Sequence, residues 1–180
     1  MTTPVQTDSE LLDSIANDKI WALHALLVGG ADPDAAGPQG AAIALAARKG
    51  EAGFLQALIA AGANVNGRDS AGDTALMNAV RHGHEENIML LLEKGANAGC
   101  TNPQGESAAG IAEKIFEANA LNVHSAALDG SLLPVEQQLL TRWERLAALL
   151  KERYAEAVTV KLPANLSVHK PLQFKKRAPA

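Results

Sequence analysis

The chain has 180 residues, a size that fits one domain or one compact repeat array with an extension. Aromatic residues make up only 3% of it, so the composition favours many short, closely packed helices over a large aromatic core. It contains no apolar run long enough to span a membrane, and its first ten residues do not resemble a secretory signal. A single cysteine, Cys100, excludes an internal disulfide and favours a reducing, cytoplasmic compartment.

The net charge of −4 hides an uneven distribution along the chain. Residues 1–157 hold 11 basic and 20 acidic residues, which gives −9, whereas residues 158–180 hold five basic residues and no acid, which gives +5. The sequence therefore predicts an acidic body followed by a basic extension.

A short pattern recurs in the first part of the chain. Gly-Ala pairs stand at 30–31, 62–63 and 95–96, and Gly40, Gly72 and Gly105 recur at the same intervals. The interval is about 33 residues each time, a period which indicates that one supersecondary unit is repeated and stacked.

Each unit is predicted to hold two short helices. In the third unit, Thr74 is placed to cap the first helix, Gly83 separates the two, and Gly95 ends the second in a left-handed conformation. The apolar positions with helical spacing are Leu76, Ala79 and Val80 in the first helix and Ile88, Leu91 and Leu92 in the second.

This pattern resembles the ankyrin repeat. The third unit matches best, through Thr74-Ala75-Leu76, Gly83-His84 and Gly95-Ala96-Asn97 among other positions, and the resemblance extends over about residues 8–115. It implies an all-α ankyrin-repeat solenoid whose four units cover approximately residues 8–35, 36–67, 68–100 and 101–118.

Some positions depart from the family pattern. Ala75 and Met77 replace the usual proline and histidine, and Asn17-Asp18 stands where glycine normally separates the helices of the first unit. Gly40 to Gly50 is one residue shorter than Gly72 to Gly83, so the first helix of the second unit is expected to start differently. The fourth unit loses the pattern after Ile111-Ala112, and its first helix is predicted to continue through Ile115 and Phe116.

Residues 119–157 are predicted to form a connector and a C-terminal capping helix. The connector gives only a turn signal at Asp129-Gly130, whereas a strongly amphipathic helix follows Pro134. Such a helix either caps the solenoid or docks into a partner. Its apolar side consists of Leu139, Leu140, Trp143, Leu146, Ala147, Leu150 and Tyr154.

The basic tail, residues 158–180, contains prolines and alternating apolar side chains, which predict an extended chain. Two interpretations remain open, a solvated tail without fixed structure and a peptide that binds along a partner. The second would use lysines for steering and four apolar anchors, Leu166, Val168, Leu172 and Phe174.

No pattern in the sequence predicts catalysis, a cofactor or a metal. The run 105–110 lacks the spacing of a nucleophile elbow, so Ser107 is expected to cap a helix, and no phosphate-binding loop occurs. His82 and His84 have no clustered third ligand, and Cys100 is expected to be an ordinary thiol. The acidic body argues against nucleic-acid binding.

The resemblance implies that partners meet the loop tips and the exposed ends of the first helices. Arg48, Arg81 and Lys114 follow one another at the repeat period, so stacking would align them in a cationic row, which either binds an acidic patch on another protein or merely keeps this edge solvated. The other predicted partner-binding residues are Lys49 and His82 beside this row, Arg68 and Asp73 near its rim, Ser70 and Gln104 at the loop tips, and Glu106.

The sequence thus predicts a non-enzymatic protein-binding module, monomeric on its own. Two roles remain open, an adaptor or assembly subunit and an inhibitor or immunity-type protein that blocks a partner enzyme. Composition also suggests a bacterial, cytoplasmic protein without a membrane association.

Overall fold

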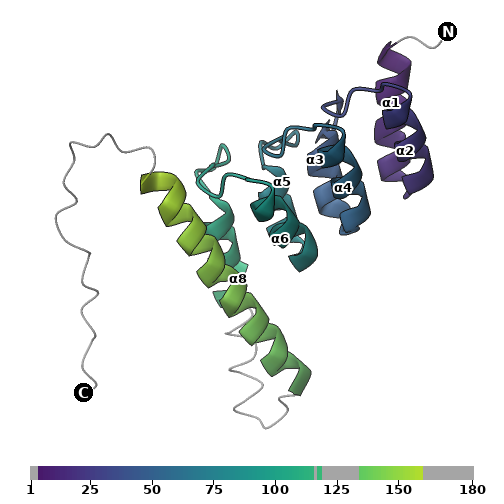
Figure 1. Ribbon diagram of the computed structural model, residues 1–180. Coiled ribbons are helices and arrows are strands. Elements are labelled where there is room, and N and C mark those ends of the chain that lie inside the picture. Colours follow the sequence, from purple (N-terminus) through teal and green to yellow (C-terminus); the bar gives the residue numbers. More distant parts are fainter. Residues whose placement is uncertain (1–3, 116, 119–133, 160–180) are drawn as a thin grey trace, which may run out of the picture.

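A computed structural model describes residues 4–115, 117–118 and 134–159, and these form a stack of paired helices (Figure 1). The first helix of the fourth unit covers residues 108–115, and residues 117–118 are also helical. The labelled helices are α1 (Pro4–Ala16), α2 (Ile20–Val28), α3 (Ala42–Lys49), α4 (Ala52–Ala60), α5 (Ala75–Arg81), α6 (Glu85–Glu93) and α8 (Pro134–Thr159). Within the described ranges the strands are limited to one short antiparallel hairpin, whose strands β1 (Ala36–Gly37) and β2 (Gly40–Ala41) have two residues each.

The helices stack in two rows, as a repeat array requires. The first helices α1, α3 and α5 contact one another in chain order, and α2, α4 and α6 form the second row. Leu58 and Leu91, which lie one unit apart in the sequence, are both fully buried in the same hydrophobic cluster. The predicted all-α solenoid is confirmed, because equivalent apolar side chains share one continuous core.

The helix ends follow the local chemistry expected of them. The Thr74 hydroxyl accepts a hydrogen bond from the Met77 amide at 3.3 Å, and the Ser107 hydroxyl accepts one from the Gly110 amide at 3.1 Å, which confirms both predicted caps. Asp18, with a φ of 57°, takes the left-handed position that Gly50 and Gly83 take in the next two units. An aspartate tolerates this conformation better than most residues do.

The loops that connect the units stack directly on one another. The Asp34 side chain accepts a hydrogen bond from the backbone amide of Asn64 at 2.7 Å, and the Asn66 side chain accepts one from the backbone amide of Asn97 at 2.8 Å.

The first helix of the second unit starts differently from that of the third, as the one-residue difference in length predicted. Helix α3 begins two residues after Gly40, whereas α5 begins three residues after Gly72.

Helix α8 covers the end of the array. Leu146, Ala147 and Leu150 are buried in the same core as the repeats, and ion pairs join Arg142 to Glu85 and Lys151 to Glu113. The predicted cap is confirmed for these side chains, and the helix continues through Thr159, two residues beyond its predicted end. The remaining predicted contacts and segments lie outside the described residues: the side chains of Leu139, Leu140, Trp143 and Tyr154, Phe116, the connector 119–133 and the tail from 160 to 180.

Candidate protein-interaction surface

The predicted basic residues lie on the first helices of three successive units, and two of them lie at the helix ends. Arg48 is in the last turn of α3, Arg81 ends α5, and Lys114 lies in the helix that follows residue 107. All three side chains are exposed, and the contact between α3 and α5 places the first two in neighbouring units. We call these three residues the cation row.

Arg81 is held by two carboxylates. Its Nε atom lies 2.8 Å from Asp73 Oδ2, and its Nη2 atom lies 2.8 Å from Glu106 Oε2. The hydrogen bond to Asp73 is the main cause that raises the pKa of Arg81, and Glu106 contributes in the same direction. Asp73 itself is only 6% exposed, so it acts on the surface through Arg81 rather than by direct contact.

Glu106 bridges two members of the cation row. It accepts hydrogen bonds from Lys114 and Arg81, and a third from the Asn102 amide group at 3.2 Å. These three donors, with Lys114 the strongest, lower the pKa of Glu106 to about 2. The carboxylate is therefore ionised at neutral pH, and Asp73 and Glu106 together balance the charges of Arg81 and Lys114.

Arg48 differs from the other two cations because its partner is neutral. Its Nη2 atom donates to the amide oxygen of Gln39 at 2.7 Å, and none of the carboxylates in the described residues forms an ion pair with it. Its neighbour Lys49 is paired, with Nζ 3.0 Å from Asp18 Oδ1 and 2.7 Å from the Ala16 carbonyl oxygen. The unbalanced positive charge of the row is thus concentrated at Arg48.

His82 lies beside the row and stacks on His84, with ring centroids 5.9 Å apart. Partial desolvation lowers the pKa of His82, and the charges of His84, Arg48 and Arg81 lower it further. His82 is therefore a neutral, exposed ring at pH 7 and adds no charge to the row. His84 has a structural role, since its Nε2 atom lies 3.0 Å from the Arg48 carbonyl oxygen of the preceding unit.

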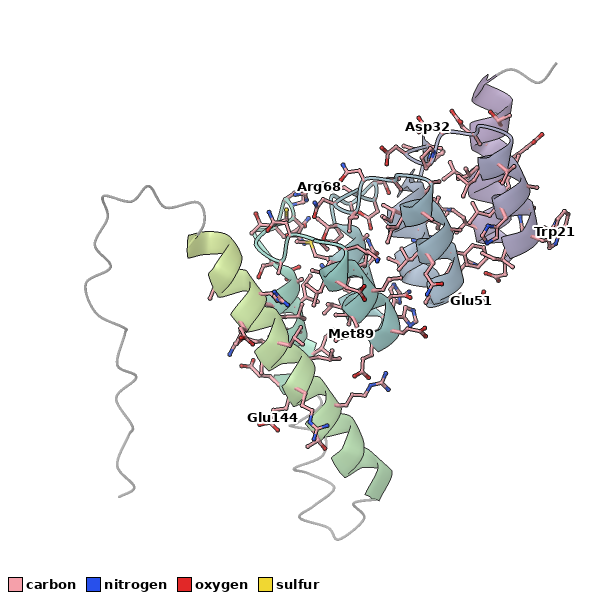
Figure 2. The ribbon with its side chains drawn as sticks, viewed as in Figure 1. Trp21, Asp32, Glu51, Arg68, Met89 and Glu144 are labelled. Atoms are coloured by element: carbon pink, nitrogen blue, oxygen red, sulfur yellow. The ribbon has the colours of Figure 1, made fainter. Side chains whose placement is uncertain are left out.

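Arg68, Ser70 and Gln104 are exposed along one edge of the array, where Figure 2 labels Arg68, whereas Glu106 is half-buried. Arg68 crosses to the next unit, with Nη1 donating to the Thr101 carbonyl oxygen at 3.0 Å. The backbone amide of Ser70 donates to the Gln39 carbonyl oxygen, and that of Gln104 donates to the side chain of Asn102. These bonds fix the backbone of both loops, and the side chains of Ser70 and Gln104 are exposed.

Two residues of the predicted loop tips organise this surface through contacts that the sequence did not predict. Asn102 is buried and donates to Asp73 Oδ1 at 2.7 Å, and Gln39 orients Arg48. A signal for the acidic partners existed, because Asp73 and Glu106 are one repeat period apart and form a second column beside the cations. Spacing alone did not show that the two columns touch.

The described residues contain no group of three side chains suited to a metal ion, and none of their helices is long and apolar enough to cross a membrane. Their chemistry is that of a polar protein surface on which Arg48 and Arg68 form none of the ion pairs found in the described residues.

Comparison with known proteins agrees with this architecture. A family model described as ankyrin repeats (3 copies) matches residues 11–102, which is just over half of the chain. A rice protein (Oryza sativa subsp. japonica) named "Probable E3 ubiquitin-protein ligase XBOS33" is 49% identical over 47 residues. That segment covers 26% of this chain and 9% of the rice protein, so the similarity concerns a small part of that relative.

Proposed function

Because the chain belongs to the ankyrin-repeat family, whose repeats are protein–protein interaction modules, we propose that it is a non-enzymatic adaptor or assembly subunit. It binds an acidic patch on another protein through the ends of its first helices and its loop tips. The residues assigned to this contact are Arg48, Lys49, Arg68, Ser70, Asp73, Arg81, His82, Gln104, Glu106 and Lys114, with Asp73 contributing indirectly.

The observation that carries this proposal is the uncompensated charge of Arg48. An arginine held by a neutral amide keeps its guanidinium available for the bidentate contact that carboxylates favour. Arg81 and Lys114 share the carboxylate of Glu106, so they present a balanced, ordered surface next to it. The flat ring of His82 adds an uncharged contact beside these groups.

The rice relative does not suggest a catalytic role for this chain. Its name describes a ligase, whereas the shared segment is only long enough for about one and a half ankyrin units of about 33 residues. Binding through repeats is the property that such a short match supports. We propose a cytoplasmic location and a monomeric state for the same module, and the rice relative lends no support to the bacterial origin suggested by composition.

The test first captures a partner with the full chain and with an Arg48→Glu variant, and identifies the captured protein. The affinity of each form of the chain for this partner is then measured at several salt concentrations. We expect the variant to bind at least about tenfold more weakly, because a charge reversal at a carboxylate contact costs more than about 1.4 kcal/mol. Lys94→Glu, on an exposed lysine outside the row, is the matched control. Unchanged affinity and unchanged salt dependence for Arg48→Glu would refute this role.

The inhibitor role is the second candidate, because loop tips such as Ser70 and Gln104 can enter a partner's active site. A measurement of the partner's activity distinguishes the inhibitor role from the adaptor role. An adaptor co-purifies in a fixed ratio and leaves the partner active, whereas an inhibitor abolishes that activity when added at equal concentration.

A further inference from the structure

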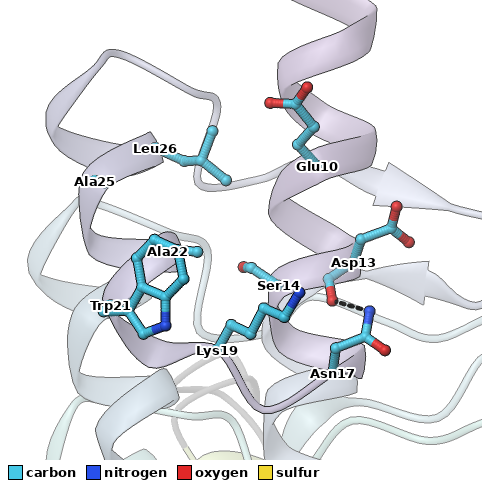
Figure 3. A pocket seen from close by; sticks show the side chains of 9 residues that line it. All are labelled: Glu10, Asp13, Ser14, Asn17, Lys19, Trp21, Ala22, Ala25 and Leu26. Atoms are coloured by element: carbon cyan, nitrogen blue, oxygen red, sulfur yellow. Dashed lines mark hydrogen bonds between the residues drawn. The ribbon is translucent and has the colours of Figure 1, made fainter.

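The first helical pair carries an open groove that lies away from the cation row. It runs between α1 and α2, has a volume of about 360 Å³, and is drawn in Figure 3. The α2 side is apolar, with Trp21, Ala25 and Leu26. The charged residues of the lining are Glu10 and Asp13 of α1 and Lys19 of the turn between the helices. Trp21 is 72% exposed, which is unusual for the largest side chain of a small protein.

The groove is the face on which another unit would stack. Ala25 stands five residues before Gly30, as Ala57 stands five residues before Gly62. Ala57 is buried because the preceding helical pair covers it, whereas Ala25 is exposed. A terminal face of a solenoid is normally polar, and here only the α1 half meets that expectation.

The first unit is negatively charged, and two of its acids, Glu10 and Asp13, line the groove together with its one lysine, Lys19. Residues 4–41 contain six acidic residues and one lysine, which gives −5, and among these acids Asp18 forms an ion pair with Lys49 of the second unit. Glu10 and Asp13 form none of the ion pairs found in the described residues. An occupant of the groove therefore needs apolar side chains for Trp21 and positive charges for the carboxylates.

A second copy of the chain does not meet these requirements. Two such faces in contact would bring Glu10 and Asp13 of one copy against the same carboxylates of the other. Stacking of this face on the far end of a second copy is blocked, because α8 covers that end with Leu146 and Leu150.

We propose that residues 160–180 of the same molecule bind this groove. This segment has five basic residues and no acid, which gives +5, and it also supplies apolar residues, including Leu172 and Phe174. Its charge is opposite in sign to the −5 of residues 4–41 and equal in size. The segment is long enough, since its extended length is up to about 70 Å and three steps between stacked helical pairs amount to about 30 Å.

The experiment measures how accessible Trp21 is in the full chain. Trp143→Phe leaves Trp21 as the single tryptophan, and acrylamide quenching of its fluorescence reports exposure without responding to charge. In this background, Lys175→Gln, Lys176→Gln and Arg177→Gln are combined with Leu172→Ser and Phe174→Ser. We expect quenching to rise about twofold, because the tethered segment otherwise covers the groove at a millimolar effective concentration.

Charge exchange separates docking from a general change in the fold. Glu10→Lys with Asp13→Lys is expected to raise quenching equally, and adding Lys175→Glu and Lys176→Glu is expected to restore protection. Glu51→Lys with Glu86→Lys, on exposed acids of the next two units, is the matched control and leaves quenching unchanged. Salt at about 1 M, where the Debye length is about 3 Å, removes the electrostatic part of the protection.

Two results would overturn the proposal. If the tail substitutions leave Trp21 quenching unchanged in the folded protein, the segment does not cover the groove. If protection appears only as the protein concentration rises, a second molecule is the occupant. Neither result depends on Arg48, so the outcome is independent of the proposed partner surface.

Discussion

Arg81 Nη2 and Glu106 Oε2 lie 2.8 Å apart and join the third helical pair to the fourth. Two cations of this edge also follow an acid by the same offset, since Asp73 precedes Arg81 and Glu106 precedes Lys114 by eight positions, whereas Gly40 stands at this position before Arg48. An acidic column and a basic column therefore alternate along the stack, and Glu106 contacts the cation of the unit before it as well as its own. This alternation makes the edge of the array a charge-balanced strip that ends at Arg48.

Acidification is expected to weaken this strip through Glu106. Its pKa falls from 4.5 to about 2 on folding, so its contribution to stability is fully present above about pH 4.5 and is lost as the pH falls toward 2. Glu106→Gln should therefore lower the free energy of unfolding at pH 7 and have little effect near pH 2. Urea denaturation of both proteins at pH 7, 4 and 2.5 measures this convergence. Glu93→Gln, in an exposed pair with its neighbour Lys94, is the control and should show no such trend.

Asn102 is expected to be necessary for the strip to form. It is 5% exposed, donates to Asp73 Oδ1 at 2.7 Å and accepts from the Glu106 amide at 2.8 Å. Asn102→Ala removes one donor from the buried Asp73, which keeps Arg81, and the acceptor of the Glu106 backbone amide, and should cost about 1–3 kcal/mol in chemical denaturation. Gln104→Ala, on an exposed side chain of the same loop, should stay within about 0.5 kcal/mol. Equal effects of the two substitutions would contradict the assignment.

The shared core predicts a large loss of stability at Leu91. This side chain is fully buried, and Leu91→Ala leaves a cavity between stacked units that should cost about 2–5 kcal/mol. Met89→Ala on the same helix removes a side chain that is 48% exposed and should cost much less. Thermal and urea unfolding of both variants measure the difference, and a near-zero loss at Leu91 would be incompatible with a continuous core.

Loop stacking predicts different responses at two equivalent glycines. Gly40 and Gly105 both have positive φ values, 100° and 78°, so alanine is strained at either position. A Cβ atom at Gly40 would lie 2.2 Å from Asp69 Cα of the next loop, whereas one at Gly105 would meet nothing within 4 Å. Gly105→Ala should cost about 1–2 kcal/mol from φ strain, and Gly40→Ala should cost clearly more. Similar losses in denaturation would show that the loops separate easily.

The repeat spacing predicted the parts of the fold that depend on local chemistry. Thr74 and Ser107 cap helices because a hydroxyl before a helical run can accept an amide hydrogen bond wherever the run occurs. The apolar period of Leu58 and Leu91 likewise required a shared core, since one helical pair cannot bury its own face. The cation row followed from the same period, because stacked units superpose equivalent positions.

The sequence by itself therefore determined the helical pairs, their stacking order and the alignment of equivalent residues. Only the tertiary structure decided which charges neutralise each other, because Arg81 and Glu106 belong to different positions of the repeat and meet through the offset between neighbouring loops. It also decided that Arg48 pairs with the neutral Gln39 rather than with a carboxylate, and that the described residues leave the groove beside Trp21 open. Both features depend on which side chains of adjacent units come within hydrogen-bonding or van der Waals distance. The repeat period in the sequence does not specify these distances.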